Sequence, residues 1–455
     1  MSSDELVGRF LIGDLIKAGV ISAHKDGNFG SLYPRIEDFG DDGFPLLTAK
    51  VVNGGRIDFG AAQKLRKEKA ARLPYGFIQA GDVLLSHNAT VGRVAVVPEF
   101  NGQALIGTSL TYFRLDTSRL LPRYLAGFFE SRDFQNQLAS VMGLSTRNQV
   151  PITAQRLLEV EVPPLKAQHR ISEFIGALDD RIALLRETNA TLEAIAQALF
   201  KSWFVDFDPV RAKQQGLAPA GMDEATAALF PDSFEESALG LVPSGWSVRQ
   251  VEDVVKRVGM GPFGSNIKVS TFVEIGIPVL NGANVQGALL EDRDFRFVTE
   301  EHAGRLRNSC VRPGDIVLTH RGTLGQVALV PAGARFAEYV LSQSQFFLRC
   351  DASVMQPEWM LYFLRSPAGQ HLLLSNASQV GVPAIARPSS HLKSIRLAVP
   401  PVEIVGCYAE TVLALHASIV GNKGTAATLN TLRDTLLPRL ISGQLRLPEA
   451  EALAA

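Results

Sequence analysis

The chain has 455 residues, enough for two to four domains, and 46% of them are hydrophobic, which allows a sizeable core. Its formal net charge is −1, so it lacks the basic balance typical of nucleic-acid-binding domains, and any such function must rest on local basic patches. No apolar run approaches the roughly 20 residues of a transmembrane helix, and the start, MSSDELVGRF, lacks the apolar segment of a signal peptide. Three widely spaced cysteines, Cys310, Cys350 and Cys407, suit a reducing compartment and exclude a zinc site built from cysteines alone. We therefore expect a cytoplasmic, multidomain protein that does not enter a membrane.

Residues 1–162 form the first predicted domain, in which strand and turn signals dominate. From Gly81, the apolar run GDVLL is followed by a polar turn and then by GRVAVVP, a pattern that predicts a β-hairpin. One helix is expected near Pro122, and short Gly-marked strands surround it. These signals indicate a mixed α+β domain.

Polar and basic side chains mark the loops of this domain. Lys64, Arg66, Lys67, Lys69 and Arg72 form a basic run, for which a solvated helix face and a phosphate contact are equally good interpretations. Residues of types that can hold phosphates or read base edges lie in the Gly-marked loops, namely Asn28, Ser31, Tyr33, His87, Asn88, Ser109, Arg147 and, less prominently, Thr108 and Asn148. For any one of them a turn or capping role is the simpler explanation.

Residues 163–205 are predicted to form one long helix. Apolar residues recur with steps that alternate between four and three, the heptad spacing of a coiled coil, at Ile171, Ile175, Leu178, Ile182, Leu185, Leu192, Ala196 and Leu199. Asn189 stands where an apolar residue is due, and a polar residue at such a position often fixes the register of a coiled coil. At 1.5 Å per residue the helix would span about 60 Å, so it needs a partner.

Residues 206–243 form a predicted linker that mixes proline, glycine and acidic residues. Short helical potential is confined to the region from Glu224 to Phe230. The excess of aspartate and glutamate argues that this segment does not itself lie on a polyanion.

Residues 244–399 repeat the first domain. GDVLLSHNATVGRVAVVP from Gly81 matches GDIVLTHRGTLGQVALVP from Gly314, and the turn around Phe29 matches the turn around Phe263. Six such matches in one order, at a period of about 235 residues, indicate a duplication. The second copy offers the candidate reading residues Ser265, Asn266, Lys268, His320, Arg321, Gln343, Ser344 and, less prominently, Asn281, Asn284 and Gln345. As a set in two matched domains, the polar loop residues favour a surface that reads nucleic-acid bases.

Residues 400–445 are predicted to form a second long helix, followed by a tail at 446–455. Pro400 and Pro401 repeat the pair Pro163 and Pro164 that precedes the first helix. The helix carries matching seam positions, namely Tyr408, Val412, Leu415, Ile419, Leu429, Leu432 and Leu436. Gly421 and Gly424 weaken its middle, each by roughly 1 kcal/mol relative to alanine.

No catalytic constellation emerges from the sequence. There is no phosphate-binding P-loop, no nucleophile elbow and no His-Glu-x-x-His metal motif. The aminomethyl-transferase signature is absent because both Pro-Pro pairs are flanked by apolar residues. His87 and His320 occupy matched positions without a neighbouring ligand pattern, so a structural or hydrogen-bonding role is more common than catalysis for such residues.

Several specific phrases carry a resemblance to a known family. They are VPPLKAQHRISEFIGALDDRI, ALFKSWFVDFDPVRAK, ALFPDSFEESALGLVPSGWSV, GPFGSNIK, GDIVLTHRGTLGQVALVP and LLPRLISGQL. Over almost its whole length the chain resembles the specificity subunit of type I restriction-modification systems. The resemblance implies two target-recognition domains separated by two long helices that pair as an antiparallel coiled coil, with pseudo-twofold symmetry. The first domain departs from the pattern, with His-Asn-Ala-Thr where the second has His-Arg-Gly-Thr, so an arginine contact is not carried across to it.

The same resemblance implies a non-catalytic, cytoplasmic subunit that reads a split, asymmetric double-stranded DNA site. Its expected partners are two DNA methyltransferase subunits and an ATP-dependent motor-nuclease subunit, which methylate adenine or cleave DNA. The chain itself is expected to bind no cofactor, whereas the partner methyltransferase would use S-adenosylmethionine. The alternative is a duplicated protein-binding scaffold without DNA specificity.

Overall fold

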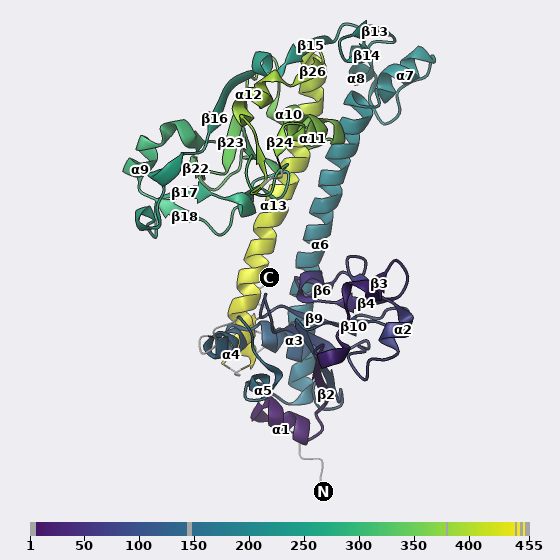
Figure 1. The fold of residues 1–455 in the computed structure, drawn as a ribbon, viewed down its shortest axis with the longest axis vertical. Coiled ribbons are helices and arrows are strands. Elements are labelled where there is room, and N and C mark those ends of the chain that lie inside the picture. The colour runs from purple at the N-terminus through teal and green to yellow at the C-terminus, as the bar shows by residue number, and fades with distance from the viewer. Residues whose placement is uncertain (1–5, 143–147, 379–380, 442–443, 446–448, 451–455) are drawn as a thin grey trace. The chain divides into compact units, whose positions relative to one another are not determined.

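The computed structural model describes residues 6–142, 148–378, 381–441, 444–445 and 449–450 (Figure 1). The chain divides into two compact units. Unit 1 comprises Met1–Leu184 and Thr425–Ala455, and unit 2 comprises Leu185–Gly424. Two 40-residue helices, α6 (Leu165–Phe204) and α13 (Val402–Ile441), each contribute one half to each unit. We call the sheets and short helices of each unit its sheet domain.

The sheet domain of unit 1 contains two four-stranded sheets. The first has the order β2 (Ile21–Asp26), β11 (Leu110–Leu115), β8 (Val83–Ser86), β9 (Val94–Val96), and all its neighbours are antiparallel. The second has the order β10 (Leu105–Ile106), β4 (Phe44–Leu47), β7 (Gln63–Leu65), β3 (Phe39–Gly40), and β10 pairs with β4 in parallel. The predicted hairpin from Gly81 is therefore confirmed as β8 and β9.

Unit 2 repeats this topology. Its first sheet has the order β16 (Val255–Met260), β23 (Gln345–Cys350), β20 (Asp315–Thr319), β21 (Val327–Leu329). Its second sheet has the order β18 (Arg296–Val298), β17 (Ile277–Leu280), β22 (Tyr339–Leu341), β19 (Cys310–Val311), with the parallel pair again between equivalent strands, β17 and β22. Even an isolated bridge recurs. Phe77 pairs with Leu105 in unit 1, and the matched residues, Cys310 of β19 and Val340 of β22, pair in unit 2. The duplication read from the sequence is thus a duplication of fold.

Helices cover one face of each first sheet. α3 (Pro122–Glu130) and its counterpart α10 (Pro357–Arg365) both begin at a proline, whose missing N–H costs nothing at the start of a helix. Val83 and Leu85 of β8 point into the core that α3 shares, whereas Leu84 joins the core on the opposite face. β8 is buried on both faces, so its apolar residues run continuously instead of alternating.

Shorter elements complete each unit. In unit 1 they are β1 (Gly8–Leu11), α1 (Ile12–Lys17), β5 (Val52–Asn53), β6 (Arg56–Ile57), α2 (Lys67–Ala70), α4 (Arg132–Met142), α5 (Ile152–Gln155) and β12 (Glu159–Val162). In unit 2 they are α7 (Asp208–Gln214), α8 (Glu224–Leu229), β13 (Phe234–Ser237), β14 (Gly240–Pro243), β15 (Ser247–Gln250), α9 (Glu300–Arg305), α11 (Pro367–Leu374), β24 (Ala377–Ser378), β25 (Ala384–Ile385), α12 (Pro388–Ser394) and β26 (Arg396–Val399). β1 pairs with β12, and β15 pairs with β26, so in each unit the strand that opens the domain meets the strand that leads into a long helix.

The segment predicted as a linker, residues 206–243, is built into the core of unit 2. Val210 of α7 and Phe230, which follows α8, are 0% and 2% exposed and pack in the same cluster as Trp203 and Trp246. The prediction of a short helix around Glu224 is confirmed by α8. Composition alone did not predict this burial, because it depends on two apolar residues among many polar ones.

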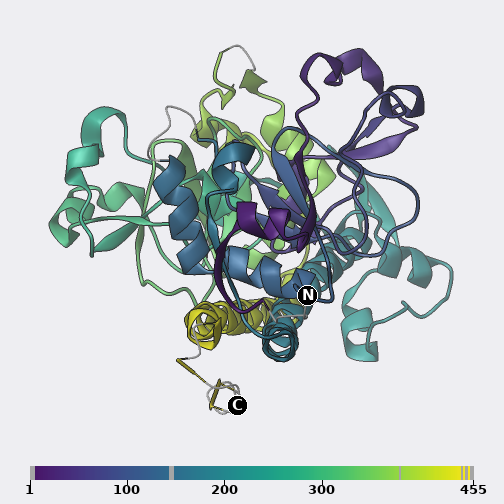
Figure 2. The ribbon, with the colours of Figure 1, turned by 90° about the horizontal axis from the view of Figure 1, so that it is seen from below.

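The two long helices pair antiparallel within each unit. In unit 1 the first half of α6 packs against the last part of α13, where Ile175, Leu178 and Leu436 share one core and Leu429 lies partly buried against it. In unit 2 the last half of α6 packs against the first part of α13, and the Tyr408 hydroxyl donates a hydrogen bond to the Ala196 carbonyl at 3.1 Å. Figures 1 and 2 show α6 in teal and α13 in yellow side by side. The predicted antiparallel coiled coil is confirmed.

The remaining seam positions are buried or half-buried as well. Ile182 and Leu185 are 3% and 7% exposed. In unit 2, Val412 and Ile419 lie in the core, and Leu192, Leu199 and Leu415 are partly buried against it. α13 stays continuous through Gly421 and Gly424 because tertiary packing offsets their low helix propensity.

A polar pair lies in the seam where the sequence placed Asn189. Its side-chain oxygen accepts a hydrogen bond from the Asn422 amide nitrogen at 2.9 Å. Each amide satisfies the other, so the pair favours the register in which the two residues face each other.

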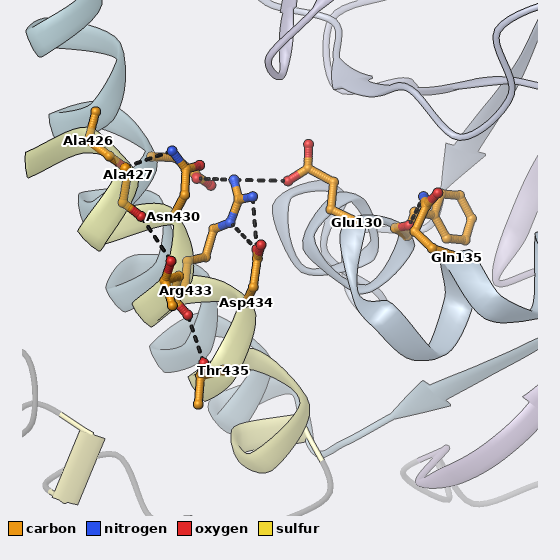
Figure 3. Close-up of polar contacts among 11 residues, drawn as sticks. Glu130, Gln135, Ala426, Ala427, Asn430, Arg433, Asp434 and Thr435 are labelled. Atoms are coloured by element: carbon orange, nitrogen blue, oxygen red, sulfur yellow. Dashed lines mark hydrogen bonds and ion pairs between the residues drawn. The ribbon is translucent and has the colours of Figure 1, made fainter. Parts of the chain in front are cut away.

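Arg433 on α13 ties the sheet domain of unit 1 to the long helices. Its guanidinium lies 3.5 Å from Glu130 at the end of α3, 2.8 Å from Asp179 on α6 and 3.0 Å from Asp434 (Figure 3). Burial by itself lowers the pKa of Arg433, but the carboxylates, Glu130 foremost, outweigh it and the pKa is raised. The side chain of Arg433 is 19% exposed and those of its three partners are 25–61% exposed, so this is a partly desolvated ion cluster.

Unit 2 has a corresponding clamp with the charges exchanged. Arg365 ends α10 where Glu130 ends α3, and its guanidinium lies 2.7 Å from Glu193 on α6. It also donates to the Val327 carbonyl at 2.9 Å. In each unit, an ion pair therefore joins the end of a sheet-covering helix to the C-terminal half of a long helix. The charges are reversed, since the carboxylate lies on α3 in unit 1 and on α6 in unit 2.

α13 meets the length and hydropathy of a membrane-spanning helix. Both of its halves contribute residues to the apolar cores of the two units, so its hydropathy is that of a core helix.

Candidate nucleic-acid interface

Five turns are joined by hydrogen bonds at one end of the sheets of unit 1, and we call them loop cluster 1. They span residues 27–31, 48–49, 86–89, 107–109 and 148–150. The backbone bonds that connect them are Gly27 N to Leu110 O at 3.3 Å, Gly107 N to Leu47 O at 2.7 Å, His87 N to Ser109 O at 3.0 Å and Val150 N to His87 O at 2.8 Å. The Ser109 hydroxyl also accepts a bond from the Ala49 amide at 2.8 Å. Turns from both sheets are thus held in one surface.

Loop cluster 2 repeats this network in unit 2. It spans residues 261–266, 281–282, 320–322, 342–344 and 383–385. The equivalent bonds are Gly261 N to Gln345 O at 2.8 Å, Ser342 N to Leu280 O at 3.1 Å, His320 N to Ser344 O at 3.0 Å and Ile385 N to His320 O at 2.9 Å. The scaffold of the two clusters is the same, so their differences lie in the side chains.

Glycine is required where two of these turns cross. A Cβ atom at Gly27 would collide with the backbone of Gly107, and one at Gly261 would collide with the carbonyl of Ser342. These glycines let the first loop pass directly over the turn between the two sheets.

The hairpin tips have different residue types at one position with left-handed backbone. Ala89 in cluster 1 has φ 63°, whereas its counterpart Gly322 has φ 90°. Left-handed backbone is strained for alanine and free for glycine. Arg321 precedes Gly322 and is exposed, whereas Asn88 at the matched position is half-buried.

Most predicted reading residues of the first domain lie in or beside loop cluster 1. Asn28, Ser31, Lys64 and Lys67 are exposed, and Tyr33, Asn88 and Ser109 are half-buried. The Asn28 side chain accepts a bond from the Gly30 amide at 3.2 Å, and the Lys64 ammonium donates to the Asp41 carbonyl at 3.1 Å. Arg147 lies outside the described residues.

His87 is the exception, because it lies inside the domain. Its side chain is 2% exposed, and burial lowers its pKa. Neither ring nitrogen has a hydrogen-bond partner among the described residues. In this conformation the ring supports the loops from below and is not part of the exposed surface.

Most candidates of the second domain lie at or near the surface, but Asn284 and Gln345 are buried and cannot contact a ligand in this conformation. Asn266, Lys268, Arg321 and Gln343 are exposed, and Ser344 is half-buried. The ring of His320 is half-buried, with its Nε2 atom 3.2 Å from the Gln343 carbonyl, and burial lowers its pKa. The side chain of Ser265 lies outside the described atoms.

The basic run of the first domain is only partly free to contact a ligand. Lys69 forms an ion pair with Asp38 at 3.0 Å, with both side chains about four-fifths buried. The backbone amide of Arg66 donates to the Asp38 carbonyl at 3.0 Å. Lys64, Arg66, Lys67 and Arg72 remain exposed. Lys69 is therefore a structural residue, and its neighbours keep their cationic side chains at the surface.

A matched ion pair fixes the first sheet of each unit, and residue-type reasoning missed it. Arg114 contacts Asp82 at 2.8 Å, and Arg349 contacts Asp315 at 2.6 Å. Both carboxylates are 1% exposed. The signal was present, because aspartate follows glycine in both GDVLL and GDIVL, and arginine follows an aromatic-apolar run in both FRLD and LRCD.

The described residues contain no group of three or more histidine, cysteine, aspartate or glutamate side chains that could hold a metal ion. What the two clusters offer instead is neutral hydrogen-bonding groups and isolated cations. Such groups bind phosphates and base edges.

Comparisons with known proteins find one matching family and several relatives. The family described as the type I restriction modification DNA specificity domain matches residues 38–194. The HindI specificity subunit of Haemophilus influenzae is 24% identical over 81% of this chain and 87% of its own length. The MjaIX specificity subunit of Methanocaldococcus jannaschii is 22% identical over 91% of this chain and 90% of its own length. A solved S subunit from M. genitalium aligns over 97% of this chain and 98% of its own, with 13% identity and a TM-score of 0.48.

Proposed function

The chain belongs to the family of type I restriction-modification specificity subunits, and from this premise we propose that it reads a split, asymmetric double-stranded DNA site through its two loop clusters. The subunit supplies recognition, and methylation or cleavage belongs to its partners.

The observation that carries the proposal is a shared scaffold with different side chains. The backbone network is the same in both clusters, whereas Asn88 is matched by Arg321 and Thr108 by Gln343. Asparagine and glutamine pair with adenine in the major groove, and arginine pairs with guanine. Two equivalent surfaces with different hydrogen-bonding groups select different half-sites.

We further propose that the chain works in the cytoplasm with two methyltransferase subunits and an ATP-dependent motor-nuclease subunit. The chain binds no cofactor of its own, and S-adenosylmethionine belongs to the methyltransferase. The net charge of −1 supports this division of labour, because phosphate contacts by this chain alone supply only a modest binding term. Affinity for DNA should therefore rise strongly when the methyltransferase subunits are added.

Methyl transfer by a reconstituted complex tests the proposal. The purified methyltransferase is given DNA and radiolabelled S-adenosylmethionine, with and without this chain. We expect methylation of a discrete motif only when the chain is present. Arg321→Ala should weaken methylation by changing one half-site, and Asn88→Ala should act on the other. Methylation that does not depend on the chain would favour the protein-binding scaffold.

A further inference from the structure

One phenylalanine occupies matched positions in the two loop clusters but is buried in only one. Phe29 is 5% exposed and packs between Tyr33 and Tyr75, with ring centroids at 6.3 and 5.4 Å. Phe263 is the matched residue of loop cluster 2, two positions after Gly261, and it is 69% exposed. Burying such a ring is worth roughly 1.5–3 kcal/mol, so unit 2 forgoes a contribution that unit 1 retains.

The residue that lies beneath the ring in unit 1 differs between the two units. In unit 1, Gly76 leaves the space open, and a Cβ atom there would lie 2.8 Å from the Phe29 ring. The residue matched with Gly76 in unit 2 is Ser309, which is buried and whose hydroxyl donates a hydrogen bond to the Met260 carbonyl at 2.8 Å. Unit 2 therefore has a Cβ atom at the position where, in unit 1, a Cβ atom would clash with the buried phenylalanine ring.

An open pocket adjoins the exposed ring. It has a volume of about 380 Å³, and its wall includes Pro262 and Gly264 on either side of Phe263. Gln343 and Arg296 also line it, and Arg296 is the only charged residue in the wall. Arg296 lies over the Phe272 ring at 5.1 Å and forms no ion pair with the residues that the structure describes. An exposed aromatic ring beside an unpaired cation suits a nucleic acid, which offers apolar base surface next to phosphate.

We propose that Phe263 is a base-contacting residue of unit 2 that unit 1 lacks, and that Arg296 holds the phosphate beside the contacted base. The ring supplies an apolar contact, as phenylalanine does with the methyl group of thymine. The inference rests on the proposed function and adds a specificity-determining residue to it. Phe263 is therefore kept at the surface for recognition, whereas Phe29 is a core residue.

Methyl transfer by the full chain with its methyltransferase tests the inference. Phe263→Ala is compared with wild type on the methylated motif and on duplexes with each base pair of the second half-site changed. We expect at least a fivefold lower rate on the wild-type motif, because losing the recognition of one base pair costs about 1–3 kcal/mol. Discrimination should be lost at one base pair of that half-site and kept throughout the other. Phe263→Leu, which preserves an apolar side chain, should be intermediate.

Leu241→Ala is the matched control, because Leu241 is 65% exposed on the β13–β14 hairpin, outside the loop cluster. It should change neither rate nor base preference, and both variants should melt at the wild-type temperature. Arg296→Ala should lower the slope of log affinity against log salt by about one. If Phe263→Ala matched Leu241→Ala in rate and base preference, the inference would be overturned. Sequence-independent methylation by the wild type would overturn the proposed function, and this inference with it.

Discussion

Removing Arg433 should loosen the sheet domain of unit 1 from the long helices. Its guanidinium is shared by Glu130 and Asp179, whose side chains are 25% and 40% exposed. Exposed ion pairs contribute about 0–1 kcal/mol, and breaking a fully buried pair costs about 3–5 kcal/mol. This cluster lies between those cases, so Arg433→Ala should cost on the order of 2 kcal/mol of stability in unit 1.

The distribution of tryptophan makes the assay specific. All three tryptophans, Trp203, Trp246 and Trp359, lie in the core of unit 2. Hydrogen exchange of peptides from α3 and the last turns of α13 reports on unit 1, while tryptophan emission during urea unfolding reports on unit 2. Arg433→Ala should accelerate exchange in unit 1 about 30-fold, the equivalent of 2 kcal/mol, and leave the emission midpoint nearly unchanged.

Arg433→Ala, Glu130→Ala and the double variant complete a thermodynamic cycle. We expect the two changes to be coupled by at least about 1 kcal/mol, whereas Arg170→Ala on the exposed face of α6 should cost less than about 0.5 kcal/mol. Arg365→Ala should instead lower the urea midpoint followed by tryptophan emission, because the ion pair between Arg365 and Glu193 lies in unit 2. Strict additivity of Arg433 and Glu130 would refute the reasoning.

Three other predictions follow from particular contacts. Ala89→Gly should stabilise unit 1 by about 0.5–1 kcal/mol, because φ is 63° at Ala89. Ala71→Gly should destabilise unit 1, because φ is −61° at Ala71. Urea unfolding followed by hydrogen exchange measures both changes in stability. Asn189→Leu leaves the Asn422 amide without its partner and should lower the free energy of unfolding by about 1 kcal/mol, measured by urea unfolding. Adding Asn422→Leu to the same chain should reverse this loss. Burial lowers the pKa of both His24 and His416 to about 4, so both rings stay neutral in the folded chain while the unfolded chain binds protons below about pH 6.5. Stability should therefore be full above about pH 6.5 and fall toward pH 4, by on the order of 1 kcal/mol per ring at pH 5.5, and His416→Asn should remove that loss from the tryptophan-monitored transition.

Local periodicity predicted a large part of the fold. The four-three spacing of Ile175, Leu178 and Ile182 defined the coiled-coil seam, and the repeated hairpin sequence defined β8–β9 and β20–β21. These patterns are readable because each residue's environment is set by neighbours a few positions away.

Features that depend on distant residues were not readable. The burial of Phe29 requires Gly76, 47 positions further along the chain, because a Cβ atom there would lie 2.8 Å from the ring. The burial of His87 depends on the turn at Val150, whose amide donates to the His87 carbonyl. Residue type therefore predicted which loops form the candidate interface better than which side chains reach its surface.

Whether the chain specifies a split DNA site can be measured by sequencing the methylated bases of a host with and without this chain, with the partner subunits expressed in both. One motif should lose its methylation when the chain is removed, and this motif should have two different half-sites joined by a spacer of unspecified bases. Because the two loop clusters share a scaffold but differ at Asn88 and Arg321, the half-sites should not be copies of each other. A host that kept every methylated motif, or a lost motif that proved palindromic or unbroken, would contradict the account.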